Sequence, residues 1–572
     1  TPLDRVEKAE VMYSAPPEYH VRGAVINIVL KRSHDYSFQG EVNADYTNQY
    51  FNSGGANGNF RLSTPKMAFD VMYGANDVKK MEYMDLYSRH TLKNQVYDIR
   101  QNEQLRMKYW NHNFRTVFEY NLNDKDNLNL AYTGSFTPDQ HSNSLTSGNY
   151  QASNVDKYVE TRMHNVTLQY HSGSGFDVGG DYTRYTSDNN QTLSADYTEG
   201  GQSCFSIIGG QKIDRYSIYA DRKRSLGKEW NLSYGMSYRF AKDRDFQTYD
   251  KVVGDIQTEN TDSRLHEHTA NVYVSLSKNY ATGTSVSVSA TGEYYTIGSY
   301  RKWAVYPQAS LTYVKSPEHL FQFSLSTDKT YPGYWDMQSS VSHLNGYTEL
   351  WGTPGLKPST TYNLNGNYIW KQKYIFGLFF MHTSDFFVQT GYQSTDRLAL
   401  IYKNTNWNYM QMWGANVILP FKVGNWLDSR LTLIGMQVRQ RCDDFFDIPF
   451  NRKKWMINGS LDNTFKVSKN LALELIGSLQ TPMIQGTFDI ETVYNLTAGI
   501  KWGFANDRIS LSARCSDLFN SGMPNLKVRF KGQHLDMNNG FYSRAFTLLF
   551  NYRFGGYKKK EVRKIDTSRF GH

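Results

Sequence analysis

The chain has 572 residues, of which 39% are hydrophobic and 15% aromatic, and its formal net charge is +9 at pH 7. Its mean hydropathy is -0.62, and no apolar run approaches the roughly 20 residues that a membrane-spanning helix requires. This composition excludes a helical membrane protein. The three cysteines form no C-x-x-C pair, which excludes a redox or zinc motif of that kind.

The first 33 residues differ in pattern from the rest of the chain. Residues 9–11 are Ala-Glu-Val, and small residues and prolines follow from Ser14 to Pro17. A glycine-led run begins at Gly23 and includes Asn27 and Ile28. We predict that residues 1–33 form a structural unit of their own.

From about residue 36 to residue 554, strands with an apolar side chain at every second position alternate with polar turns. A period of two places successive side chains on opposite faces of a sheet. The clearest example is the strand whose apolar face comprises Trp230, Leu232, Tyr234, Met236, Tyr238 and Phe240. An apolar outer face sustained over hundreds of residues is typical of an outer-membrane β-barrel. A soluble all-β protein is the alternative.

Short polar connections between these strands are rich in Gly, Asn, Asp, Ser and Pro, as tight turns require. They fall at Thr64–Lys66, Asn123–Asn127, Ser172–Gly175, Ser225–Glu229, Lys278–Gly283, Lys315–His319, Lys371–Lys373, Gly424–Asp428, Ser468–Asn470 and Ala505–Arg508. If both barrel ends are periplasmic, these turns imply an all-β, antiparallel transmembrane barrel of about 22 strands over residues 34–556.

Longer irregular stretches separate the turns and predict extracellular loops, for example at residues 137–162, 187–212, 327–359 and 520–542. Cys204 and Cys442 fall in such loops and could form a disulfide, whereas Cys515 falls in a strand. Spacing along the sequence does not decide whether the two loop cysteines come close enough to pair.

After the last strand, residues 557–572 carry six basic side chains against two acidic ones. A basic tail is compatible with nucleic acid binding. In a barrel protein we expect instead a solvated periplasmic end that touches anionic lipid headgroups, and we expect no nucleic acid partner.

Four elements resemble those of TonB-dependent receptors, in particular the outer membrane protein β-barrel subfamily, and together they extend over essentially the whole chain. They are the strand, proline turn and G-x-x-N-I strand at residues 9–28; Tyr331–Gly333 with Gly352–Pro358; Ser516–Asn520; and the closing Tyr552–Gly555. Thr353 stands where the family commonly has asparagine.

The resemblance implies that residues 1–33 are the carboxyl end of a plug domain, with Gly23, Asn27 and Ile28 as its motif, and that the chain is a fragment of a longer receptor. It implies uptake of a scarce nutrient across the outer membrane of a Gram-negative bacterium, driven by the TonB complex. The expected partners are TonB, outer-membrane lipid and a small nutrient ligand, and whether a surface lipoprotein caps the barrel is left open. Siderophore, haem, cobalamin, glycan and peptide all remain open as ligands. No cofactor is expected.

Two groups of aromatic side chains in the expected loops are candidates for ligand binding, because aromatic rings can stack on a ligand. They are Tyr331, Tyr334, Trp335 and Trp351 in the seventh loop, and Trp407, Tyr409 and Trp413 in the eighth. Aromatic girdles at the lipid headgroups are the favoured alternative, because such belts are common in barrels. A role in ligand binding and a role in the girdle therefore both remain open.

Catalytic and metal sites are not expected. His266 and His268 share one strand face, but two imidazoles without a third ligand are a weak metal signal. No nucleophile elbow, phosphate loop or zinc-protease motif is present, so we predict no enzyme. Two functions remain: energised uptake, and a passive channel or surface-binding barrel. Residues 1–33 favour uptake, because a porin has no need for a plug strand.

Overall fold

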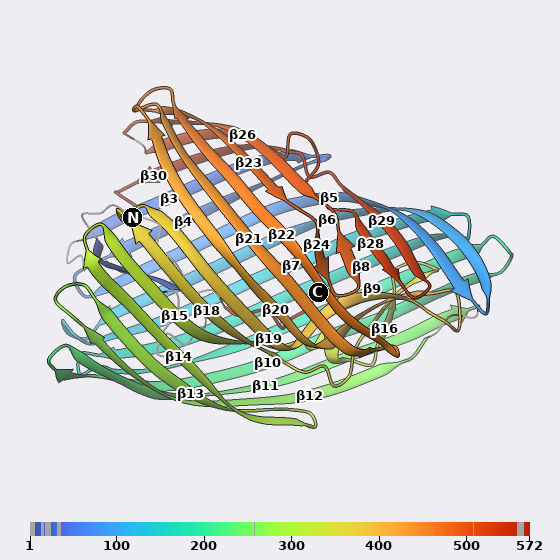
Figure 1. Ribbon diagram of the computed structural model, residues 1–572, viewed down its shortest axis with the longest axis horizontal. Coiled ribbons are helices and arrows are strands. Elements are labelled where there is room, and N and C mark those ends of the chain that lie inside the picture. Colours follow the sequence, from blue (N-terminus) through green and yellow to red (C-terminus); the bar gives the residue numbers. More distant parts are fainter. Residues whose placement is uncertain are drawn as a thin grey trace.

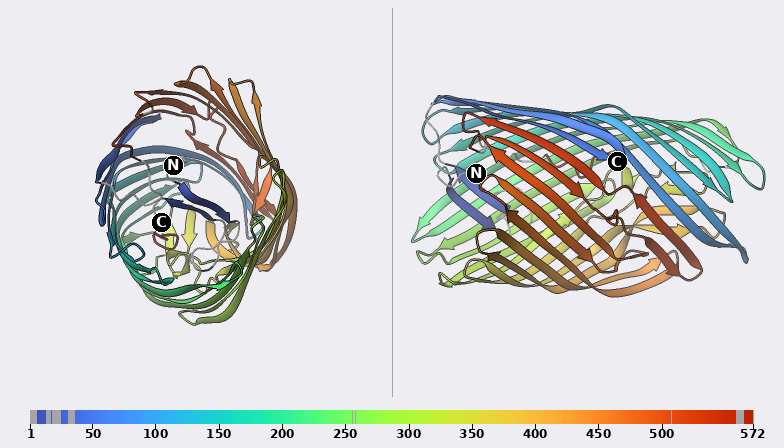
Figure 2. Two further views of the ribbon diagram at one scale, coloured as in Figure 1. Left: turned by 90° about the vertical axis from the view of Figure 1, so that its left-hand side faces the viewer. Right: turned by 90° about the horizontal axis from the view of Figure 1, so that it is seen from above.

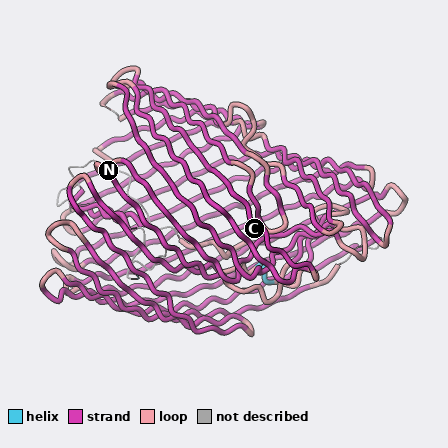
Figure 3. The backbone as a smooth tube through the Cα atoms, viewed as in Figure 1, coloured by secondary structure: helices cyan, strands magenta, loops and turns pink. Residues whose placement is uncertain are grey.

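The computed structural model describes residues 6–12, 17, 25–30, 36–254, 256, 258–506, 508–557 and 565–571. It is a closed antiparallel barrel of 22 strands, as predicted, and in projection the tilted strands of its near wall cross those of its far wall (Figure 1). Strands make up most of the backbone, and irregular segments gather mainly at the two ends (Figure 3). Within the described part of the chain, no helix is long and apolar enough to cross a membrane.

The wall of the barrel follows the chain order and closes where β30 pairs with β3. Its strands are β3 Ser37–Gln49, β4 Phe51–Ser63, β5 Met67–Leu92, β6 Gln95–Asn121, β7 Asn127–Gly148, β8 Gln151–Ser172, β9 Phe176–Tyr197, β10 Gln202–Gly227, β11 Trp230–Val253, β12 Thr261–Asn279, β13 Ser285–Ile297, β14 Tyr300–Ser316, β15 His319–Thr330, β18 Ser359–Trp370, β19 Tyr374–Gln393, β20 Leu400–Val423, β21 Leu427–Phe445, β22 Ile448–Lys466, β23 Leu471–Gln480, β26 Val493–Phe504, β27 Ile509–Ser516 and β30 Ala545–Phe554.

All ten predicted short turns lie between consecutive wall strands, from the turn between β4 and β5 to the turn between β26 and β27. They share one end of the barrel with Ser37 and Phe554, where the wall begins and ends. We call this the short-turn end. The agreement follows from chemistry, because tight turns restrict residue type more strongly than strands do.

Two of the predicted long loops are wrong. Residues 137–162 belong almost entirely to β7 and β8, and residues 187–212 to β9 and β10, with only short connections between the strands. The outer faces of these strand extensions are mostly polar, and Val155, Leu193 and Phe205 are buried on the inner side. The apolar outer face that marks a lipid-facing strand is therefore absent there. Cys204 and Cys442 therefore lie on β10 and β21 rather than in loops, and both thiols are free.

Hairpins from the long loops complete the wall at the opposite end, which we call the loop end. These loop strands are β16 Val341–His343, β17 Thr348–Trp351, β24 Met483–Gln485, β25 Phe488–Ile490, β28 Leu526–Phe530 and β29 Gln533–Phe541. β29 pairs with the loop-end half of β5, β25 pairs with β28, and β17 runs parallel to β20. The loop hairpins thus cover edges that the short strands β3, β4 and β30 leave unpaired.

The seventh loop, residues 331–358, crosses the inside of the barrel at the loop end. The Tyr347 hydroxyl lies 2.7 Å from Ser88 Oγ and 2.9 Å from His90 Nδ1, both on β5. Four strands further along the wall, Gln191 on β9 donates to the His343 carbonyl oxygen at 2.9 Å. Leu86, Ile99, Tyr347, Leu400, Phe488, Val528, Leu535 and Met537 form a buried apolar cluster there. The lumen at the loop end is therefore packed like a protein core.

In the half of the barrel nearer the short-turn end, the outer surface is apolar and the inner surface is polar. On β11 the side chains of Tyr234, Met236 and Tyr238 are 45%, 61% and 42% exposed on the outside, whereas Ser233 is buried. The apolar outer face and polar interior match the predicted outer-membrane barrel.

This orientation can be tested with an arginine on each face at one depth. Leu378 on β19 is 70% exposed on the outer face. Gly366 on β18 lies directly opposite Leu378 in the strand pairing, so the preceding residue, Asn365, lies at the same depth and faces the lumen. We expect Leu378→Arg to lower the free energy of unfolding in lipid vesicles by about 2–4 kcal/mol, because the outer surface there faces hydrocarbon.

The matched control is Asn365→Arg, which should cost much less because its side chain faces the lumen. Denaturant titrations of the two refolded variants measure both values. Equal losses would contradict the assigned faces.

The first described strands, β1 Val6–Met12 and β2 Val25–Leu30, pair with each other and not with the wall. Asn27 pairs with Glu10 and Ile28 with Ala9, whereas Gly23 lies outside the described residues. Seen along the barrel, this hairpin lies within the ring of wall strands (Figure 2).

The end of the chain also lies within the ring (Figure 2). Of the predicted basic tail, residues 558–564 are outside the described part, but residues 565–571 contact the inner wall instead of being solvated. The sequence-based expectation is wrong for this segment. Its Arg569 is 6% exposed and pairs with Glu267 on β12, so burial of the charge is compensated within the lumen.

Candidate functional site

A cavity of about 750 Å³ lies in the lumen between the short-turn end and the packed loops. Polar and charged side chains from the wall line it, including Arg115, Asp181, Arg215, Arg239, Glu293 and Lys329. Pro17, between β1 and β2, lines it as well, as do Asp566 and Ser568 of the terminal segment. The cavity is thus enclosed by three separate parts of the chain.

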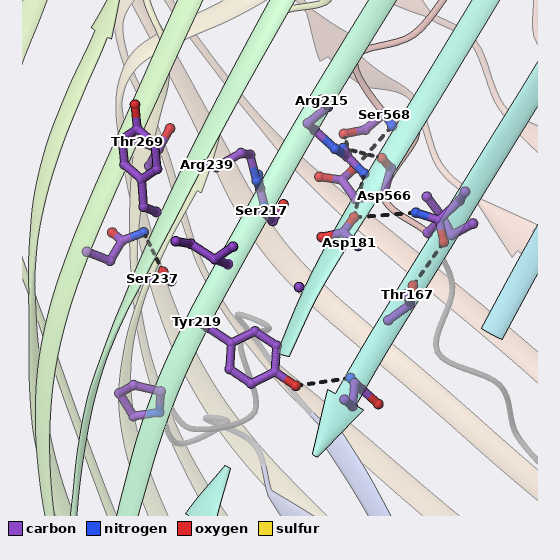
Figure 4. A pocket seen from close by; sticks show the side chains of 18 of the residues that line it. Thr167, Asp181, Arg215, Ser217, Tyr219, Ser237, Arg239, Thr269, Asp566 and Ser568 are labelled. Carbon is purple, nitrogen blue, oxygen red and sulfur yellow. Dashed lines mark hydrogen bonds and ion pairs between the residues drawn. The ribbon is translucent and has the colours of Figure 1, made fainter. Parts of the chain in front are cut away.

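Arg215 on β10 joins the wall to the terminal segment (Figure 4). Its guanidinium donates to the Asp566 carbonyl oxygen at 2.7 Å and to Thr183 Oγ1 at 3.4 Å, and it lies 3.9 Å from the Asp181 carboxylate. The side chain is 7% exposed. A nearly buried guanidinium with these partners has a fixed orientation, because its donors form a rigid fork.

A buried ion pair lies further toward the loop end. Lys329 on β15 is 2.5 Å from the Glu293 carboxylate on β13, and the two side chains are 2% and 1% exposed. Glu293 also accepts hydrogen bonds from Tyr306 and Tyr331 at 3.3 and 3.1 Å. The Lys329 ammonium lies 4.1 Å from the centre of the Tyr295 ring, so both polar and aromatic contacts hold the cation.

A second acidic group, Glu267 on β12, lies beside this pair. It accepts a hydrogen bond from the Tyr334 hydroxyl and forms an ion pair with Arg569. The Arg569 guanidinium lies 4.1 Å from the centre of the Tyr334 ring and 5.2 Å from that of Tyr331. Burial raises the pKa of Tyr334, so its hydroxyl stays protonated and can donate to the carboxylate.

The seventh-loop aromatic candidates are only partly brought together. Tyr331 and Tyr334 both contact this cluster of charges, and Trp335 follows them on the short 3-10 helix η3, Trp335–Met337. Trp351, at the end of β17, donates to Glu349 at 2.8 Å and lies elsewhere in the loop. The loop therefore contributes two adjacent tyrosines to the lumen.

The eighth-loop candidates do not lie in a loop, and this placement corrects the sequence-based one. Trp407 and Trp413 are both on β20, because β20 extends beyond the expected membrane span. Trp407 is 1% exposed and packs with Val388, Tyr392, Cys442, Phe445 and Phe450. Trp413 is 47% exposed and meets Trp455 edge to face on the outer surface. These positions favour packing and girdle roles.

His266 and His268 share one face of β12, as the alternation predicts. Both rings lie against Phe240, and His268 Nδ1 is 2.7 Å from the Tyr238 hydroxyl. Among the described residues, no group of three or more His, Cys, Asp or Glu side chains is arranged to hold a metal ion.

Sequence reasoning missed Glu267, Glu293, Lys329 and Arg569. Charged residues occupy many inward positions of a polar barrel, so no local signal separates these four from the rest. Lys329 and Glu293 are 36 residues apart, and their contact is revealed only when β13 and β15 are placed on the two sides of β14.

The model of the outer membrane protein beta-barrel family matches residues 168–552. The chain belongs to this family. It is accordingly an integral outer-membrane protein of Gram-negative bacteria. No curated protein sequence matches the chain.

Solved structures of bacterial receptors resemble this family member in fold. The siderophore receptor PirA from Pseudomonas aeruginosa has a TM-score of 0.56 at 13% identity, over 97% of this chain and 88% of its own. A ferric enterobactin receptor from the same organism, in complex with enterobactin, has 0.60 at 13%, over 97% and 87%. The FrpB iron transporter from Neisseria meningitidis has 0.59 at 11%, over 96% and 88%. At these identities the likeness establishes the fold alone.

Proposed function

We propose that this family member is the barrel of a TonB-dependent receptor that takes up a scarce nutrient. The observation that carries the proposal is the filled lumen: β1 and β2 lie inside the ring, and the seventh loop crosses it. A passive pore needs an open path, whereas a receptor needs a closed one that opens only on demand. In this proposal residues 1–33 are the end of a plug on which TonB acts.

Several observations support a ligand site on the loop-end side of the cavity. Tyr331 lines the cavity beside Lys329 and Glu293, and Tyr334 and Trp335 follow it in the seventh loop. The similar structures include receptors described as binding siderophores, which adds iron chelates to the candidates. Haem, cobalamin, glycan and peptide remain alternatives, and Trp351, Trp407 and Trp413 are less central candidates.

Uptake in the natural host tests the proposal. Cells with and without the gene, each with and without TonB, are given radiolabelled ferric enterobactin, haem, cobalamin, a dextrin and an oligopeptide. We expect uptake of one probe to require both the gene and TonB. A sugar small enough for porins serves as the control and should enter all four strains equally.

Uptake that requires the gene but persists without TonB would contradict the proposal. A large steady conductance of the refolded chain in planar bilayers would then identify a passive channel. If no probe requires the gene for its uptake, the uptake function is ruled out for these ligands.

A further inference from the structure

The terminal segment, residues 565–571, is held by the wall at three backbone positions. Arg215 donates to the Asp566 carbonyl oxygen at 2.7 Å, and the Tyr334 amide donates to the Arg569 carbonyl oxygen at 3.3 Å. The Gly571 amide donates to Gln211 Oε1 at 3.0 Å. Repeated contacts to the backbone are typical of bound peptides, because they fix the register whatever the side chains are.

The side chain of Arg569 occupies a site that matches a guanidinium. Glu267 supplies the negative charge, the Pro332 carbonyl oxygen accepts from Nε at 3.1 Å, and the rings of Tyr331 and Tyr334 flank the plane. Planar charge, several donors and stacking surfaces are the features that distinguish arginine from lysine.

The next residue, Phe570, has its own place on the wall. Its ring stacks on Tyr185 with centroids 5.6 Å apart, and the Arg215 guanidinium lies 5.0 Å from its centre. Arg215 therefore contacts the segment twice, once through the backbone and once through this ring. The wall thus distinguishes two successive side chains as well as the chain direction.

The wall groups that make these contacts are themselves buried. Glu267 is 2% exposed, and Gln211 and Arg215 are each 5% exposed. Gln211 is further oriented by donating to the buried Asp243 carboxylate at 3.0 Å. A buried carboxylate that loses its cationic partner is strongly destabilised, so this part of the wall favours occupation by a cation.

We propose that the inner face of β9–β12, together with Tyr331–Tyr334, is a peptide-binding site for an arginine followed by an aromatic residue. In this chain the site is filled by the chain's own terminal segment, which acts as a tethered ligand. The site does not depend on the proposed uptake function, because it concerns binding to the barrel alone.

A variant that ends at Thr567 opens the site for a test in detergent micelles at pH 7. The probe is the synthetic peptide Thr-Ser-Arg-Phe-Gly-His, the sequence of residues 567–572, with fluorescein at its amino end. Fluorescence anisotropy should show saturable binding to the shortened barrel. The complete chain should bind the probe at least about tenfold more weakly, because tethering gives its own segment an effective concentration on the order of millimolar.

Two changes test the chemistry of recognition. Glu267→Gln in the shortened barrel should weaken probe binding about thirtyfold or more, because it removes the charge that pairs with the buried guanidinium. A probe with glutamine in place of arginine should lose a similar factor. Glu119→Gln is the matched control: Glu119 lines the same cavity but pairs with Arg61, so binding should not change.

The proposal is overturned if the folded shortened barrel does not bind the probe, or binds the arginine and glutamine probes equally. Heat-modifiable migration in gels establishes that each variant is folded. If the shortened chain does not fold, the full-length double variant Arg569→Ala with Phe570→Ala serves as the acceptor, and the same two outcomes decide.

Discussion

Replacing Lys329 with methionine is expected to lower the free energy of unfolding by about 3–5 kcal/mol, because it leaves the buried Glu293 carboxylate without its cation. Both side chains are almost fully buried, at 2% and 1% exposure. Methionine has nearly the volume of the lysine stem, so loss of charge rather than of packing dominates the effect. Guanidinium titration of the refolded chain, followed by tryptophan fluorescence, measures the change.

Two controls separate this effect from a general sensitivity to mutation. The double variant Lys329→Met with Glu293→Gln should recover most of the loss, because a neutral amide needs no cation and its single oxygen can still accept from one of the two tyrosine hydroxyls that now donate to Glu293. Arg244→Met breaks an exposed ion pair, with side chains 50% and 46% exposed, and should cost less than about 1 kcal/mol. A double variant as unstable as Lys329→Met would show that the ion pair is not the cause.

Trp407→Ala should destabilise the loop-end extension of β19–β22 by about 3–5 kcal/mol, because it empties the centre of a packed cluster. Trp407 is 1% exposed and stacks on Phe450 with ring centroids 5.3 Å apart. Hydrogen exchange measures the effect locally: amides of residues 386–393 and 442–450 should exchange faster, while those near the short-turn end keep their protection.

The matched control lies on the same strand. Trp413 is 47% exposed and contacts Trp455 on the outer surface, so Trp413→Ala removes a ring of equal size without opening a cavity. Its effect on exchange at residues 386–393 should be small. If both variants accelerate exchange equally, Trp407 does not hold the extension together.

The half of the barrel at the short-turn end could be predicted from the sequence, because the bilayer requires apolar and polar side chains to alternate there. Lipid requires apolar residues on the outer face, as at Tyr234 and Met236, and short turns favour residues such as the asparagines and aspartates at 123–127. Beyond the membrane that requirement ends. The segment around residues 187–197 is polar on its outer face and buries Leu193 and Ala195 on its inner face. Its strand character follows from pairing with β8 and β10, which no local pattern reports.

The candidate site was predictable only in part for the same reason. Tyr331 and Tyr334 belong to an aromatic group that is visible in the sequence, and they reach the lumen. Glu267 and Arg569 are more than 300 residues apart in the sequence and meet only in the folded chain. The basic composition of residues 557–572 predicted a solvated tail, because composition does not reveal that a buried carboxylate lies opposite one of its arginines.

The length of the wall strands has a consequence for what meets this protein first. β6 has 27 residues, which at about 3.3 Å each and a tilt near 45° span about 60 Å, against an apolar band of about 25 Å. Since the short turns end close to one side of the membrane, most of the excess stands in water on the other side. An antibody or phage protein that binds the rim at Lys93 and Asn94 therefore needs no affinity for lipid. The thickness of the bilayer likewise does not constrain the length or the sequence of the strands at that rim.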